Sequence, residues 1–131
     1  MHALIIEPEA NISLSIAADL RTVGYGSFAF ATTAEGAVLA GRDRGPDLIV
    51  AELELKLGCG IEAVEAICGR RPVPIIFMSE KRRGVPEGFA AAEMIHKPLL
   101  SGALAATVMR VRRASRTGHG LNRAFRGERP A

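Results

Sequence analysis

The feature that most constrains this chain is a regular alternation between short apolar runs and longer stretches with apolar residues every three or four positions. A short apolar run bounded by charge, glycine or proline is typical of a buried strand, and the longer spacing is typical of an amphipathic helix. The expected strands are residues 3–6, 26–31, 47–51, 73–78 and 93–96, of which the second is less apolar and nearer an edge. The expected helices are 8–23, 33–44, 61–68, a short segment 89–92, and 99–113.

Strands that alternate with helices imply a parallel sheet covered on both faces, because each crossover lays a helix on the sheet. We therefore predict an α/β fold with a doubly wound five-stranded parallel sheet. The length of 131 residues suits one core. We expect residues 1–114 to form this domain. Residues 115–131, with four arginines, three glycines and one proline, are expected to form a basic, disordered tail.

Charge, hydropathy and cysteine content indicate where in the cell this chain is expected. The net charge of +3 hides an acidic body and a basic end, since seven arginines and one acid follow from Arg110 onward. No apolar run is long enough to span a bilayer, and the first residues lack the basic start of a signal peptide. Cys59 and Cys68 lack metal-ligand spacing, so we interpret them as free thiols and expect a cytoplasmic location without membrane contact.

Polar side chains follow the expected strands 3–6, 47–51, 73–78 and 93–96. In doubly wound sheets, ligand sites lie beyond the carboxyl ends of the strands, where the strand order reverses. We therefore expect one pocket formed by Glu7, Pro8, Glu52, Glu54, Ser79, Glu80 and Lys97.

Five short motifs occur in order: residues 4–9, 45–53, 60–62, 73–79 and the His-Lys-Pro at 96–98. Through them, residues 2 to 113 resemble a chemotaxis-type receiver domain of response regulators. The resemblance implies the flavodoxin-like strand order 2-1-3-4-5. In receivers an aspartate after the third strand accepts a phosphoryl group, and an acidic pair after the first strand helps hold Mg²⁺. A hydroxyl residue and a lysine then bind the phosphoryl oxygens.

The matching positions are Glu52 for the acceptor, Glu7 and Pro8 for the acidic pair, Ser79 for the hydroxyl, Lys97 for the ammonium, and Met94 for the aromatic switch residue. The connection from Ser79 to Lys97 is short for the family, so we expect the fourth helix to be truncated or remodelled. We interpret His96, beside the lysine, as structural.

Three departures argue against ordinary phosphotransfer. Glu52 is one methylene longer than aspartate, which moves its carboxylate by about 1.5 Å, one C–C bond. A misplacement of about 1 Å can cost roughly 10²-fold in rate. Pro8 supplies no carboxylate, and Glu80 adds an acid where receivers carry a small residue. All three changes weaken phosphorylation.

The sequence thus favours a stand-alone pseudo-receiver, not an enzyme, that binds a signalling partner without phosphorylation. A histidine kinase, a downstream regulator and a second copy of the chain are the partners considered. Two interpretations of Glu52 remain open. It either forms a structural ion pair, with Lys97 bound to Glu52 or Glu7, or mimics a phosphorylated aspartate with less than its usual charge of about −1.5 to −2.

Two alternative functions also remain open. The first is phosphoryl acceptance from a histidine kinase, with weak Mg²⁺ binding at Glu7 and Glu52; we expect no other cofactor or metal. The second is nucleic-acid binding through the arginine-rich tail. We do not favour it, because the tail has one aromatic residue, Phe125, for stacking on bases.

Overall fold

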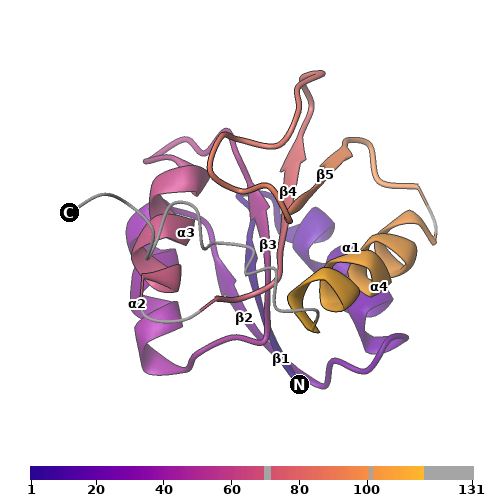
Figure 1. Cartoon of the computed structure of the whole chain (residues 1–131). Coiled ribbons are helices and arrows are strands. Elements are labelled where there is room, and N and C mark those ends of the chain that lie inside the picture. The colour runs from indigo at the N-terminus through magenta and orange to yellow at the C-terminus, as the bar shows by residue number, and fades with distance from the viewer. Residues whose placement is uncertain (70–71, 101, 117–131) are drawn as a thin grey trace.

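The computed structural model describes residues 1–69, 72–100 and 102–116. The elements are β1 (His2–Ile6), α1 (Ala10–Arg21), β2 (Ser27–Ala31), α2 (Ala34–Asp43), β3 (Leu48–Glu52), α3 (Gly60–Cys68), β4 (Ile75–Ser79), β5 (Glu93–His96) and α4 (Ala103–Arg116) (Figure 1). The strands pair in parallel in the order β2-β1-β3-β4-β5. The predicted doubly wound sheet and its strand order are confirmed.

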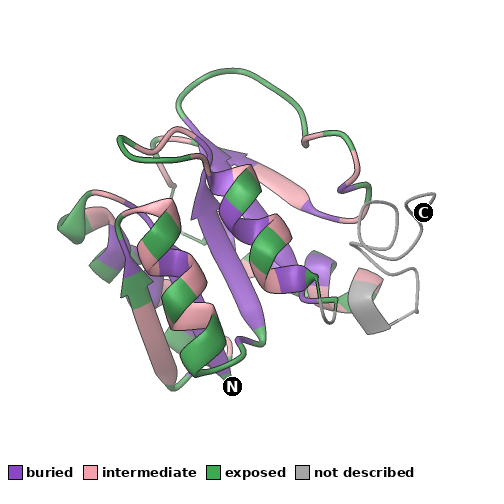
Figure 2. Cartoon of the chain, turned by 90° about the vertical axis from the view of Figure 1, so that its left-hand side faces the viewer, coloured by how far each residue is buried: buried purple, intermediate pink, exposed green. Residues whose placement is uncertain are grey.

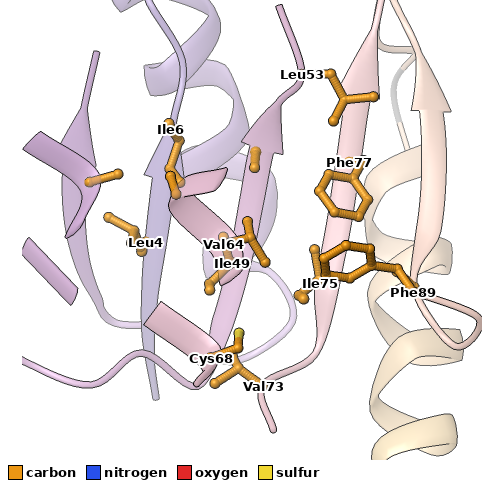
Figure 3. Packing of buried hydrophobic residues seen from close by; sticks show 14 of the residues in the cluster. Leu4, Ile6, Ile49, Leu53, Val64, Cys68, Val73, Ile75, Phe77 and Phe89 are labelled. Atoms are coloured by element: carbon orange, nitrogen blue, oxygen red, sulfur yellow. The ribbon is translucent and has the colours of Figure 1, made fainter. Parts of the chain in front are cut away.

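The sheet separates two layers of buried side chains. Alternate residues of a strand point to opposite faces, so Ile6 and Ile49 pack toward α2 and α3, whereas Ile5 and Val50 pack toward α1 and α4. Figure 3 shows the first layer, in which Val64 and Cys68 of α3 meet the side chains of β1, β3 and β4. Each fully buried Ile or Leu side chain stabilises the fold by roughly 1.5–3 kcal/mol.

Burial falls from the centre of the sheet to its edges. Every residue of β1, β3 and β4 is buried, which explains why these strands read as continuous apolar runs. In β2, by contrast, one residue of five is buried. Figure 2 shows the same contrast, with purple central strands and an outer strand coloured pink and green. The prediction that the second strand lies near an edge is confirmed.

Local signals set some of the helix ends. The Thr33 hydroxyl accepts a hydrogen bond from the Gly36 N–H at 3.0 Å and caps α2. Beyond α1, Gly24 has a φ of +104°, which favours glycine and turns the chain toward β2. At the other end of α1, the expected start at residue 8 is wrong, because Glu9 is the N-cap residue and the helix begins at Ala10.

The segment between β4 and β5 differs from the prediction. A short helix was expected at 89–92, yet residues 80–92 contain turns and no helix. The Phe89 ring is fully buried and meets the Phe77 ring edge to face, with centroids 5.1 Å apart (Figure 3). The buried ring thus anchors a connection made of turns, and the remodelling expected from its length is observed.

The last helix is also shifted. It begins at Ala103 and not at residue 99, because Gly102 has a φ of +83° and interrupts helical geometry. It ends at Arg116, so the expected boundary at residue 114 falls inside α4. Residues 117–131, the rest of the predicted tail, lie outside the described residues. No helix within the described ranges is long and apolar enough to cross a membrane.

Candidate functional site

The carboxyl ends of the strands surround a cavity of about 300 Å³. Its walls are Glu7, Pro8, Glu9, Glu52, Glu54, Lys56, Glu80 and Lys97. Six of the seven residues expected to form this pocket line the cavity, and Ser79 lies behind Glu54. Sequence reasoning missed Glu9 and Lys56. Both follow a strand end by a few residues, which a wider search of the loops would have found.

Two buried carboxylates share the Lys97 ammonium. Lys97 Nζ lies 2.7 Å from Glu7 Oε1 and 2.5 Å from Glu52 Oε1, in ion-pair contacts whose side chains are at most 8% exposed. The strand register explains the meeting. Ile6 pairs with Ala51, so the residues that follow them, Glu7 and Glu52, lie side by side.

Backbone groups hold the remaining carboxylate oxygens. The Glu9 N–H donates to Glu7 Oε2 at 3.0 Å, and the Glu54 N–H donates to Glu52 Oε2 at 2.9 Å. On the other side, the Lys97 N–H donates to the Ser79 carbonyl at 2.9 Å, which fixes the start of the lysine side chain. Each carboxylate is therefore held by the Lys97 ammonium on one oxygen and by a backbone N–H on the other. Lys97 itself is held at its backbone and at its ammonium.

Burial and charge act in opposite directions on these groups. Burial raises the pKa of Glu52, and this effect outweighs the Lys97 ammonium and the Glu54 N–H, which favour the carboxylate. Burial also opposes the charge on Lys97, but hydrogen bonds from it to Glu52 and Glu7 prevail and raise the pKa of that ammonium. The lysine is thus a firmly charged centre between two acids.

A second set of contacts occupies the serine. Ser79 Oγ is fully buried and donates to the Glu54 carboxylate at 2.9 and 3.1 Å, while it accepts from the Lys81 N–H at 3.0 Å. Arg83 Nη1 binds the same carboxylate at 3.1 Å. Burial pushes the pKa of Glu54 upward, but the Ser79 hydroxyl, Glu52 and the Arg83 guanidinium together hold it below its ordinary value.

The other predicted site residues lie around this centre. Glu80 is exposed and lines both the 300 Å³ cavity and a groove of about 540 Å³ beside α1, which also involves Leu99. Met94, in the switch position, is half-buried in β5 opposite Phe77 and packs on the core. His96 Nε2 lies 3.3 Å from the Arg83 backbone nitrogen and 3.1 Å from the Arg83 carbonyl oxygen. These contacts hold the loop after β4 against the end of β5.

The donor set does not fit a magnesium ion. Mg²⁺ demands near-octahedral oxygen ligands, usually one or two carboxylates with several waters. The Lys97 ammonium lies between the two carboxylates instead, and Pro8 offers no side-chain oxygen. Within the part of the chain that the structure describes, no three His, Cys, Asp or Glu side chains are grouped as metal ligands.

Neither a protein-family model nor a curated protein sequence matches the chain. Solved structures do resemble it. The response regulator PhyR from Brucella abortus aligns with a TM-score of 0.76 and 22% identity over 90% of this chain. A two-component response regulator from Clostridium difficile aligns with a TM-score of 0.73 and 23% identity, over 88% of this chain and 98% of its own.

The N-terminal domain of a response regulator/sensory box/GGDEF 3-domain protein from Carboxydothermus hydrogenoformans reaches 27% identity. Its TM-score is 0.73, and the alignment covers 91% of this chain and all of that domain. By contrast, the chain spans about half the length of PhyR. With the strand order 2-1-3-4-5, these similarities establish the chain as a receiver-like domain with the flavodoxin-like fold.

Proposed function

We propose that this receiver-like domain is a response-regulator-like signalling protein of the cytoplasm that recognises its partner without being phosphorylated. One observation carries the proposal. The ammonium that receivers use for phosphoryl oxygens, here Lys97, is already bound by the buried carboxylates of Glu7 and Glu52. The serine hydroxyl is likewise bound to Glu54.

The charge of the cavity supports the same conclusion. Five glutamates and two lysines line it, which gives a formal charge of −3 if all are ionised. An incoming phosphoryl group is an anion and would meet this negative field. It would also have to displace Glu52 from Lys97 and Glu54 from Ser79 before it reached either group.

The contacts favour the structural interpretation of Glu52 over the phosphoaspartate mimic. The carboxylate shares its lysine with Glu7, which is the pattern of an internal ion-pair cluster. Under the structural interpretation, Glu52→Ala leaves partner recognition unchanged. Under the mimic interpretation, the same variant loses its partner while it remains folded. Affinity capture with the two proteins, each checked by circular dichroism, distinguishes these outcomes.

Incubation with acetyl phosphate and Mg²⁺, followed by intact-mass measurement, tests the proposal itself. We expect the mass of the wild-type chain to stay unchanged, while a phosphorylatable receiver treated in parallel gains a phosphoryl group. A double variant, Pro8→Asp with Glu52→Asp, serves as the matched control because it restores the two acidic positions of the family. A stable phosphoryl group on Glu52 of the wild-type chain would overturn the proposal.

A further inference from the structure

The outer edge of β2 has cations only from neighbouring elements, because Arg21 lies on the Phe28 ring and Arg44 Nη1 binds Ser27 Oγ at 2.9 Å. β2 pairs with β1, and in the described sheet no strand lies on its other side. Its five residues, Ser27–Ala31, include neither charge nor proline, the usual devices against unwanted pairing. Phe30 is 48% exposed and Phe28 is half-buried. Such an edge is a template for a further strand.

The backbone N–H and carbonyl groups on the outer side of β2 belong to Phe28 and Phe30. The Ala31 carbonyl accepts from the Glu7 N–H at 2.9 Å, so Ala31 directs its backbone toward β1. Successive residues of a strand direct their backbone groups to opposite sides, and Ala29 therefore faces β1 as well. It follows that Phe28 and Phe30 direct their N–H and carbonyl groups outward.

An apolar face continues from β2 onto α1. The Phe28 and Phe30 rings stack with centroids 6.3 Å apart, and the Arg21 guanidinium lies 5.1 Å from the centre of the Phe28 ring. Leu14 precedes Arg21 by two helical turns, so it lies on the same face of α1, and it is 63% exposed. Phe28, Phe30 and Leu14 thus lie on one side of the molecule, where Phe30 and Leu14 are exposed and Phe28 is half-buried. These side chains and the outward backbone of β2 are hereafter the β2 edge.

We propose that the β2 edge binds a second copy of this chain, strand against strand and antiparallel, about a two-fold axis at Ala29. In that register Phe28 of each copy lies opposite Phe30 of the other. Each such pair exchanges two hydrogen bonds, because both residues direct their backbone groups outward. All four rings then lie on the same face of one continuous ten-stranded sheet, and the two Ala29 side chains lie opposite each other on the other face.

Self-complementarity is the reason for choosing a second copy over an unrelated strand. The five-residue strand has small residues at its centre and ends and phenylalanines between them, so it matches itself when reversed. Opposed aromatic pairs across strands are favourable. One short strand buries less than the roughly 1,200 Å² of a standard interface, so we expect a weak, concentration-dependent dimer. The inference does not depend on the proposed function.

Analytical ultracentrifugation of the full chain over a range of concentrations tests the dimer. We expect the wild type to shift from monomer to dimer, and Phe30→Lys to remain monomeric because a charge is placed in the pairing edge. Leu100→Lys is the matched control, since Leu100 is 70% exposed beyond β5, at the other side of the sheet. A wild-type chain that stays monomeric up to about 1 mM overturns the proposal, as does a dimer unaffected by Phe30→Lys.

A cross-link tests the register. Opposed residues of a non-hydrogen-bonded antiparallel pair have Cα atoms about 4.5 Å apart, within the range of a disulfide. With Cys59 replaced by serine to remove the partly exposed thiol, Ala29→Cys should form a disulfide-linked dimer on mild oxidation. A Thr22→Cys variant in the same background, exposed after α1, should not. Equal cross-linking of the two variants would contradict the proposed register.

Discussion

Replacing Lys97 with methionine tests how the centre of the site is held together. The substitution keeps much of the apolar length of the side chain but removes the ammonium that lies 2.7 Å from Glu7 and 2.5 Å from Glu52. Both carboxylates would then remain buried, with Glu7 1% and Glu52 3% exposed. We expect a large loss of stability because uncompensated buried charge is costly.

The size of the loss follows from the geometry. The two Oε1 atoms touch the same Nζ, so they lie at most about 5 Å apart. Two unit charges at that distance repel by about 3 kcal/mol at an effective dielectric constant of about 20. Removing one partner of a buried ion pair typically costs about 3–5 kcal/mol. We expect Lys97→Met to lose about this much, a large part of an ordinary domain stability of roughly 5–15 kcal/mol.

Urea unfolding at pH 7, followed by circular dichroism, measures the change. A triple variant, Glu7→Gln, Glu52→Gln and Lys97→Met, removes all three charges together and should recover most of the lost stability. If Lys97→Met fails to fold, a folded triple variant still shows that the loss came from the uncompensated carboxylates. A loss below about 1 kcal/mol for Lys97→Met, the value of an exposed pair, would refute the reasoning.

Two further predictions concern the same end of the sheet. Because burial raises the folded-state pKa of Glu52 above its ordinary 4.5, the folded state holds that proton more tightly. This contribution to stability is present at low pH and is lost as pH rises through the interval above 4.5. Glu52→Gln should therefore be at least as stable as the wild type at pH 7 and should flatten this dependence in urea titrations from about pH 4.5 to 7; a loss above about 2 kcal/mol at pH 7 would contradict it. Gly60→Ala would place its Cβ 2.3 Å from the Glu52 carbonyl oxygen, so we expect a loss of about 1–3 kcal/mol or more in thermal or urea unfolding. Gly84→Ala, whose Cβ meets nothing within 4 Å, is the control and should change little; equal effects of the two alanines would be the contrary result.

Much of the candidate site could be predicted from the strand ends alone. In a parallel sheet, the residues that follow neighbouring strands meet at one edge, and Glu7, Glu52 and Lys97 do so. The sequence is compatible with Lys97 pairing with Glu52 or with Glu7, and in the structure it pairs with both. A choice between neighbouring carboxylates depends on side-chain positions that no sequence spacing specifies.

The errors in the helices have a similar origin. The segment 89–92 has a pattern compatible with a short helix, but Phe89 is buried against the Phe77 ring in a connection made of turns. The start of α4 was placed too early because apolar residues at 99 and 100 continue the helical spacing, whereas Gly102 interrupts the geometry. In both places the apolar spacing suggested a helix, and one residue, Phe89 or Gly102, has a conformation that this spacing does not predict.

The order of residues along the chain is enough to predict five strands, their parallel arrangement and the end of the sheet at which the acidic residues gather. These properties follow from apolar periodicity, which is local and repeats in every element. Which polar groups bind each other depends instead on the packed layers: Glu54 binds Ser79, and two carboxylates share one ammonium. Such pairings join residues far apart in the chain, and their geometry exists only after the layers have packed.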